Sequence, residues 1–197
     1  GYMRWGADCL TRLRGMFTIV IWDKQARELF IARDPLGVKP LYYLHQDDRF
    51  IFASEVRTVL KAGNINRKID RAALLEYFRY QSIGFPFSPV EGIRQMEAGT
   101  WMGIKNGEIR THKYWDPIAK NHDFEFTSKK EVQQKIRQLM LQSVKRRLVS
   151  DVPVGAFLSG GIDSSVVVGL MAEAGSSSPN TFNISFDESG YDESKYA

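Results

Sequence analysis

One short stretch of the sequence combines small, hydroxylated and acidic residues at a spacing suited to binding phosphate. Residues 154–158 are apolar, residues 159–161 read Ser-Gly-Gly, and Asp163, Ser164 and Ser165 follow. The apolar run predicts a buried strand of a parallel sheet, and the residues from Asp163 onward predict a helix. The first amides of a helix lack partners within it, and the helix dipole favours an anion. This strand, turn and helix start therefore predict a phosphate-binding loop.

Each residue type in this loop contributes to that chemistry. Gly160 and Gly161 permit positive φ and a close approach of the backbone to phosphate, and the serine hydroxyl groups are hydrogen-bond donors. Asp163 is suited to hold Mg²⁺ between its carboxylate and the phosphates. The loop is not a Walker P-loop, because Gly161 and Ile162 stand where that motif has Lys and Ser or Thr.

Further elements of the C-terminal half would position this loop. Ser128 and Glu131 form the capping-box pattern of a helix that we expect to run to about Leu148. A buried stripe on that helix is predicted at Val132, Ile136, Leu139, Met140, Val144 and Leu148. Residues 181–186 predict a second parallel strand, two positions of which would floor an adenine pocket.

The N-terminal part has the pattern of an antiparallel β domain with helices packed on it. Strands are expected at residues 15–22, 28–32, 41–45, 49–53, 100–104 and 108–111. Asn106-Gly107, between the last two strands, is the strongest short hairpin signal. Asp70 is expected to cap a helix that runs to about Tyr80. The apolar residues of this helix are expected to face inward: Leu74, Leu75 and Phe78.

Two groups of residues resemble known families. The Ser-Gly-Gly-Ile-Asp-Ser-Ser sequence at residues 159–165 resembles the pyrophosphate loop of the ATP-pyrophosphatases. Four upstream stretches, residues 15–17, 22–23, 32–43 and 52–55, resemble the later half of a class II glutamine amidotransferase domain. In this order the two groups are similar to glutamine-hydrolysing asparagine synthetase, and Tyr-Trp-Asp at residues 114–116 resembles that family's join between domains.

The resemblance implies a protein of the α/β and α+β classes with two domains. Residues 1–118 would form the C-terminal half of an αββα glutaminase domain of the N-terminal-nucleophile kind. Residues 127–197 would form the first βαβ portion of a parallel-sheet ATP-pyrophosphatase domain, which is adenine nucleotide α-hydrolase-like. Because two strands and one crossover helix cannot complete such a sheet, we expect the chain to be a fragment of a longer protein.

The resemblance further implies an ATP-dependent, glutamine-hydrolysing amide ligase. In that family aspartate is activated as an acyl-adenylate, ammonia from glutamine attacks it, and asparagine, AMP and pyrophosphate are released. The matching positions imply a set of ATP- or pyrophosphate-binding residues, of which Asp163 is also the Mg²⁺ ligand: Leu158, Ser159, Gly160, Gly161, Asp163, Ser164, Ser165 and Ile184. No catalytic residue is expected within the chain. The glutaminase nucleophile and glutamine-binding residues would lie upstream of Gly1, and the aspartate-binding residues beyond Ala197.

Composition and charge limit the class of protein. Hydrophobic residues make up 43% of the sequence and charged residues 25%, which is typical of a soluble globular protein. No apolar run approaches the roughly 20 residues of a membrane span. The single cysteine, Cys9, fits a reducing cytoplasm, and we interpret it as a partly buried thiol, not a nucleophile. The net charge of +4 gives no argument for nucleic acid, so the expected partners are ATP, aspartate and glutamine, with a homodimer left open.

Three alternatives stay open. One is a β-lactam synthetase-like ligase, which uses an internal amine in place of ammonia. Another is a tRNA-modifying pyrophosphate-loop protein that grips RNA with the basic face of the helix after Ser128, although we interpret that face as solvated. A third is an incomplete, inert piece. The role of Arg33 and Asp34 is also open, between a structural ion pair and a rim that faces the other domain.

Overall fold

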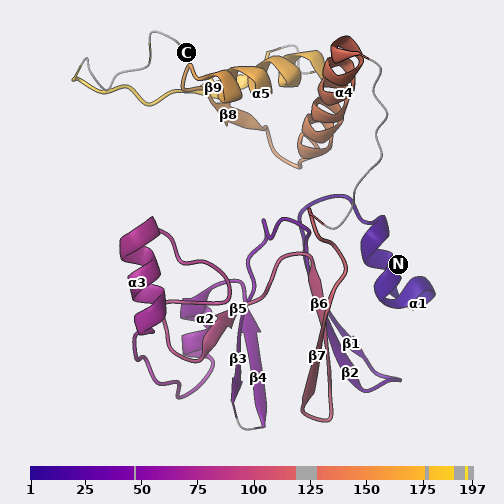
Figure 1. The fold of residues 1–197 in the computed structure, drawn as a ribbon, viewed down its shortest axis with the longest axis vertical. Coiled ribbons are helices and arrows are strands. Elements are labelled where there is room, and N and C mark those ends of the chain that lie inside the picture. Colours follow the sequence, from indigo (N-terminus) through magenta and orange to yellow (C-terminus); the bar gives the residue numbers. More distant parts are fainter. Residues whose placement is uncertain (47, 119–127, 176–177, 189–193, 195–197) are drawn as a thin grey trace. The chain divides into compact units, whose positions relative to one another are not determined.

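A computed structural model describes residues 1–46, 48–118, 128–175, 178–188 and 194 (Figure 1). Contacts between Cα atoms divide the chain into two compact units, Gly1–Asn121 and His122–Ala197. Within the described residues no helix is both long and apolar enough to cross a membrane. The predicted domain limits at residues 118 and 127 lie close to this division and stay a prediction.

The first unit contains two antiparallel sheets, as the hairpin patterns predict. The four-stranded sheet has the order β1-β2-β6-β7 and the three-stranded sheet the order β4-β3-β5. Their strands are β1 (Thr18–Asp23), β2 (Glu28–Arg33), β3 (Tyr42–Gln46), β4 (Arg49–Ala53), β5 (Ile93–Gln95), β6 (Thr100–Lys105) and β7 (Glu108–Lys113). Strand β5 is not predicted by the sequence pattern, because three residues are too few for an alternation of apolar and polar residues to show.

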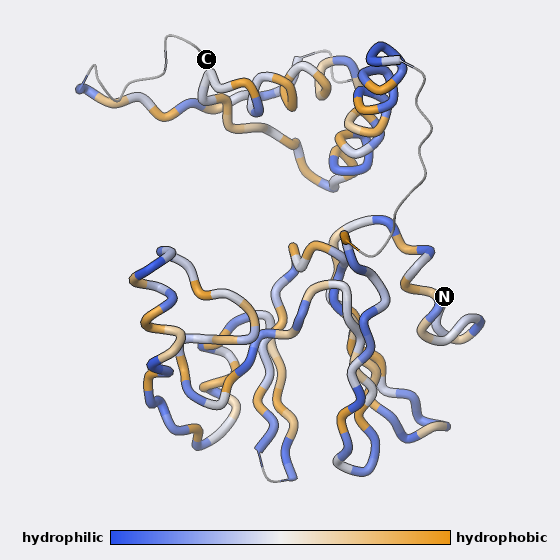
Figure 2. Tube along the Cα trace, viewed as in Figure 1, coloured by the Kyte–Doolittle hydropathy of each residue, from blue (hydrophilic) through white to orange (hydrophobic). Residues whose placement is uncertain are grey.

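The core of this unit lies between and outside the two sheets. Ile31 of β2 and Met102 of β6 pack with Leu41 and Met96 between the sheets. The opposite face of the four-stranded sheet packs on η1 (Gly6–Arg12), which follows α1 (Tyr2–Trp5). The outer face of the three-stranded sheet packs on α2 (Val56–Lys61) through Val59. The layers are therefore helix, sheet, sheet and helix, and Figure 2 shows hydrophobic residues along the strands and mostly hydrophilic ones at the hairpin tips.

Local sequence signals are confirmed at two places in the first unit. Asn106 and Gly107 have φ values of 51° and 80°, as the tight β6–β7 hairpin requires. The Asp70 carboxylate accepts hydrogen bonds from Ala72 N at 2.8 Å and Ala73 N at 3.1 Å, and so caps α3 (Arg71–Tyr80). Cys9 is buried in the core with Leu10, as a structural thiol should be.

The inward orientation predicted for the apolar residues of α3 is wrong. Leu74, Leu75 and Phe78 are all exposed, and Ala73 is the buried residue of this helix. Helical spacing correctly places these side chains on one side of α3, but it does not indicate which element covers them. In the described part of the chain no element packs over that side closely enough to bury it.

The loop between β2 and β3 is held by two buried charged residues, Arg33 and Asp34, which are 5% and 1% exposed. The Arg33 guanidinium donates to the carbonyl oxygens of Gly37 at 2.7 Å and Lys39 at 2.9 Å, and also to that of Met96. Burial lowers the pKa of Arg33, against the opposing effect of Asp34. Both side chains thus bond to the backbone, so their role in this unit is structural.

The Asp34 carboxylate accepts three backbone hydrogen bonds from the loop that follows it. They come from Leu36 N at 3.1 Å, Val38 N at 3.0 Å and Lys39 N at 2.9 Å. Leu36 and Val38 themselves are exposed. The loop is therefore ordered by a buried acid beneath it, and its apolar side chains do not hold it in place.

Gly99 joins this loop to the segment that follows β7. Its N–H donates to Asp34 O at 3.0 Å, and its carbonyl accepts from Tyr114 N at 2.9 Å and Trp115 N at 3.1 Å. Gly99 has φ 66°, and a β-carbon there would lie 2.6 Å from Trp115 O. Only glycine fits this close approach without displacing Trp115.

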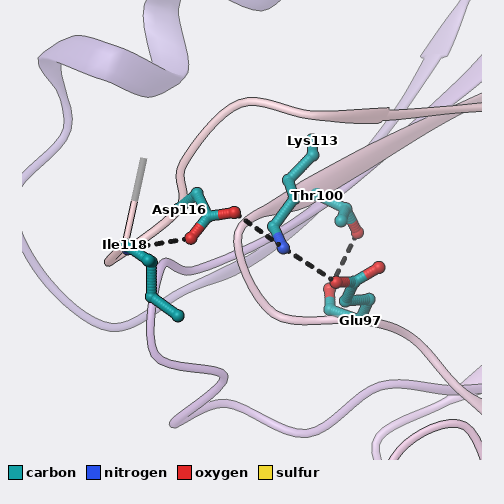
Figure 3. A network of polar contacts seen from close by, with 5 residues as sticks. All are labelled: Glu97, Thr100, Lys113, Asp116 and Ile118. Atoms are coloured by element: carbon teal, nitrogen blue, oxygen red, sulfur yellow. Dashed lines mark hydrogen bonds and ion pairs between the residues drawn. The ribbon is translucent and has the colours of Figure 1, made fainter. Parts of the chain in front are cut away.

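A cluster of charged side chains secures the same segment (Figure 3). Lys113 Nζ lies 3.3 Å from Glu97 Oε1 and 3.2 Å from Asp116 Oδ2. The other carboxylate oxygen of Asp116 accepts from Ile118 N at 2.9 Å. These partners raise the pKa of Lys113 through hydrogen bonds to Asp116 and Glu97. The chain thus stays bonded to the first unit as far as Ile118.

Tyr114 makes the stability of this segment depend on pH in the alkaline range. Its hydroxyl donates to Arg33 O at 2.8 Å, and burial, with a contribution from Asp34, raises its pKa from 10.0 to about 12. The unfolded chain therefore releases this proton first, so the stability that Tyr114 contributes is complete below pH 10.0 and is lost as pH rises toward 12. We expect the difference in unfolding free energy between wild type and Tyr114→Phe to shrink between about pH 10 and about pH 12. Denaturant titrations measure this difference, and one that stays constant across the range would contradict the assignment.

The second unit is a small α/β arrangement. Its helices are α4 (Lys129–Arg147) and α5 (Ile162–Glu173), and its strands β8 (Gly155–Phe157) and β9 (Asn180–Phe182) pair in parallel. Ser128 caps α4 by accepting from Glu131 N at 3.2 Å, as predicted. Figure 2 shows hydrophobic and hydrophilic residues alternating around α4.

Three predictions about burial and length in this unit are wrong. The stripe on α4 is not buried, since Ile136, Leu139 and Met140 are exposed. The strand before the loop is not buried either, with Phe157 75% exposed. The second strand ends at Phe182, short of the predicted residue 186. The shared cause is that a two-stranded sheet, among the residues described here, offers too little surface to cover these side chains or to extend the ladder.

Candidate nucleotide-binding site

The predicted phosphate-binding loop lies between the end of β8 and the first turn of α5. Gly160 has φ 75°, the left-handed conformation for which glycine is suited. Gly161 has φ −72° and is the N-cap of α5. Among the residues that the structure describes, a β-carbon on Gly161 would lie near Ser159 Oγ alone, at 3.5 Å. Gly160 therefore shapes the turn, whereas Gly161 leaves the space in front of the helix open.

The three serine hydroxyls of the loop lie close together. Ser164 Oγ lies 3.2 Å from Ser159 Oγ, accepts from Ser159 N at 3.3 Å and donates to Gly161 O at 3.1 Å. Ser165 Oγ also donates to Gly161 O, at 2.8 Å. Hydroxyl groups rotate freely, so each can turn its donor toward an anion placed at the helix start. The structure thus brings together the loop residues that the sequence predicts.

Asp163 lies in the first turn of α5 and is exposed. The described residues contain no group of three or more His, Cys, Asp and Glu side chains able to hold a metal ion. A single carboxylate still fits Mg²⁺, which proteins commonly bind through one or two carboxylates together with substrate phosphates and water. Asp163 therefore suits a metal that arrives with a nucleotide, not one held by the protein alone.

A hollow of about 240 Å³ adjoins the loop. Leu158 and Ile184, the two residues predicted to contact the nucleotide, both line it. Most of its wall is apolar, and the remaining lining residues are Phe157, Ser159, Phe182, Asn183 and Phe186. An apolar wall next to a phosphate-binding loop suits a nucleobase.

Sequence reasoning missed Asn183 as a member of this site. The available signal was a polar residue inside an otherwise apolar run, between Phe182 and Ile184. A larger hollow of about 540 Å³ lies between α4 and α5 and includes none of the predicted site residues. The size of a hollow alone would therefore not have indicated the hollow beside the loop.

Comparison with known protein families matches both parts of the chain. Residues 1–115 match the glutamine amidotransferase domain. Residues 135–197, which contain the loop and the hollow beside it, match asparagine synthase. The two matches stand in the order that the sequence motifs indicate.

Several curated proteins are similar to the chain over nearly all of its length. It is 40% identical to the putative glutamine-hydrolyzing asparagine synthetase 2 of Methanocaldococcus jannaschii, over 99% of this chain and 38% of that protein. It is 32% identical to the glutamine-hydrolyzing asparagine synthetase 3 of Bacillus subtilis, over 95% of this chain and 31% of that protein. It is also 32% identical to the amidase chry2 of Gibberella zeae, over 100% of this chain and 31% of that protein.

The chain thus spans between 31% and 38% of the length of these relatives. A single family covers more than half of the chain, since the first match runs from residue 1 to residue 115 of 197. The chain therefore belongs to the glutamine amidotransferase domain family, and this domain is followed by a region similar to asparagine synthase.

Proposed function

We propose that the whole protein is an ATP-dependent, glutamine-hydrolysing amide ligase that makes asparagine from aspartate. The observation that carries this proposal is the serine- and glycine-rich loop at the start of α5, with an apolar hollow beside it, in the region similar to asparagine synthase. The amidotransferase match of the first unit supports glutamine as the nitrogen source. The layers of that unit support our further proposal of an αββα glutaminase domain of the N-terminal-nucleophile kind. A cytoplasmic location and a homodimer stay predictions.

The proposed reaction has two chemical steps in the second unit. A carboxylate oxygen of aspartate attacks the α-phosphorus of ATP, and pyrophosphate leaves with the electron pair of the broken P–O bond. Ammonia then attacks the acyl carbon, loses a proton and expels AMP. The loop hydroxyls and the free amides of α5 donate hydrogen bonds to the leaving pyrophosphate. Asp163 would hold Mg²⁺, which would supply positive charge to the phosphate oxygens when bound.

The similarity to a protein named as an amidase shows that the relatives of this chain are not all named as asparagine synthetases, which leaves room for a second candidate with a different acceptor. In this candidate the same loop activates a carboxylate other than that of aspartate, as in a β-lactam synthetase-like ligase. The two candidates share the nucleotide site and differ in the acceptor, so only the acceptor distinguishes them.

A product assay on the full-length protein tests the proposal. We expect Mg-ATP, glutamine and aspartate together to give asparagine, glutamate, AMP and pyrophosphate in equal amounts. We also expect ATP–pyrophosphate exchange to require aspartate. Exchange that depends on a different carboxylic acid would favour the second candidate, and ATP cleavage to ADP would contradict both.

Asp163→Asn tests the proposed Mg²⁺ ligand. The amide keeps the shape of the side chain but loses the charge that a hard cation needs, so we expect exchange to fall at least about tenfold and to recover partly at high Mg²⁺. Asp151→Asn is the matched control, because Asp151 is an exposed acid just before β8. If ATP–pyrophosphate exchange is unchanged in Asp163→Asn, the carboxylate does not bind Mg²⁺, and its role is limited to a favourable interaction with the helix dipole.

A further inference from the structure

The side chain of Asn183 is bonded to the last residue before the phosphate-binding loop. Asn183 Nδ2 donates to Leu158 O at 2.7 Å. Leu158 N donates to Phe182 O at 2.9 Å. Both backbone polar groups of Leu158 are thus tied to the segment formed by β9 and the residue after it.

The Asn183 side-chain bond lies beyond the regular ladder, whereas the bond from Leu158 N to Phe182 O is the last bond of the ladder. The β8–β9 pairing runs from Gly155 opposite Asn180 to Phe157 opposite Phe182. Leu158 comes one residue later, where the chain turns toward Ser159. At this point the Asn183 side chain supplies the donor for Leu158 O, and so extends the pairing by one residue.

Holding Leu158 O also sets the direction of Ser159 N–H. The two groups belong to the same peptide unit, which is planar, and they point in opposite directions across it. Ser159 N–H accordingly points into the loop, where it donates to Ser164 Oγ at 3.3 Å. Rotation of this peptide would turn the donor away from the place where the loop can meet an anion.

We propose that Asn183 is a positioning residue that directs the Ser159 N–H toward the β- and γ-phosphates of the nucleotide. This inference rests on the proposed binding of ATP at the loop. This role differs from a general role in stabilising the sheet, because it affects binding of the phosphates much more than binding of the base. A nucleotide without β- and γ-phosphates does not need the Ser159 donor, whereas pyrophosphate alone does.

The test compares Mg-ATP, Mg-pyrophosphate and AMP by calorimetry on the full-length protein. Asn183→Leu removes the donor with little change in side-chain size, and Asn183→Asp replaces it with an acceptor. We expect Asn183→Leu to weaken ATP and pyrophosphate binding about tenfold, the effect of losing one well-placed hydrogen bond, and AMP binding less than about twofold. AMP affinity also reports that the variant is folded.

Acidification provides a second readout. In the Asn183→Asp variant a protonated carboxyl group can again donate to Leu158 O, so ATP affinity relative to wild type should recover as pH falls from about 6 to about 4, through the usual pKa range of an aspartate carboxyl group. Asn183→Leu cannot recover in this way. Asn180→Asp is the matched control, since it introduces the same charge three residues earlier on β9, and it should neither weaken ATP binding by more than about twofold nor respond to pH.

The outcomes separate this inference from the function on which it rests. Wild-type protein that binds no Mg-ATP would overturn the proposed function and this inference with it. Wild-type binding together with unchanged ATP affinity in Asn183→Leu would overturn the inference alone. An equal loss for AMP and ATP would also overturn it, because that result indicates a structural role.

Discussion

Gly161→Asp should raise the Kd for Mg-ATP of the full-length protein at least about a hundredfold, whereas Gly161→Asn should raise it less than about tenfold. The backbone at Gly161 has φ −72° and its nearest side-chain atom lies 3.5 Å from an added β-carbon, so both side chains fit sterically. The difference is the charge. A carboxylate about 5 Å from a phosphate charge is repelled by about 3 kcal/mol at an effective dielectric constant of about 20.

Calorimetry at two ionic strengths measures this effect and its cause. The loss in Gly161→Asp should be smaller at high salt, because counterions screen the repulsion between exposed charges. Equal weakening of Mg-ATP binding in the Asp and Asn variants would indicate that the size of the new side chain, and not its charge, causes the loss. Wild-type affinity in Gly161→Asp would remove the loop from the nucleotide site.

Asp34→Ala should lower the free energy of unfolding by about 3 kcal/mol or more, the largest stability change that we expect in the first unit. The substitution removes the acceptor of three backbone N–H groups, from Leu36, Val38 and Lys39. Because Asp34 is 1% exposed, water cannot replace the carboxylate without opening the loop. A donor left without a partner where water cannot reach it costs about 1–3 kcal/mol, and the three donors here are partly buried.

Asp23→Ala is the matched control for this experiment. The Asp23 carboxylate accepts from Gln25 N and Ala26 N, both at 2.9 Å, in a turn that is more exposed than that of Asp34. Water can hydrate those amides, so we expect a loss of only about 1 kcal/mol. Chemical denaturation of both variants gives the comparison, and equal losses would show that the Asp34 hydrogen bonds are no stronger than surface ones.

The elements that sequence predicted well are those specified by local chemistry. Asn106-Gly107 requires positive φ at a two-residue turn, and Asp70 and Ser128 each cap a helix that begins at the next residue. Burial was harder to predict. Helical spacing places Phe78 and Ile136 on apolar faces, but which element covers a face depends on packing between distant segments.

The candidate site shows the same difference between features specified by local sequence and features that depend on distant segments. The loop from Ser159 to Ser165 could be predicted because its residue types are contiguous in the sequence. The contribution of Asn183 could not, because it depends on the β8–β9 register that brings its side chain to Leu158 O, 25 residues away. Arg33 and Asp34 suggested an ion pair by adjacency, yet each side chain bonds chiefly to backbone groups that only the folded loop presents.

The bonds around Gly99 and Lys113 bear on protein engineering. Strand β7 ends at Lys113, so a secondary-structure map would place the junction of a chimera there. A partner sequence spliced in at residue 114 would lose the hydrogen bond from the Tyr114 hydroxyl to Arg33 O and the contact of Asp116 with Lys113. A first unit that is transferred into a relative should therefore extend through Ile118. The transferred piece then keeps the bonds that hold residues 114–118, and the relative supplies only the residues beyond them.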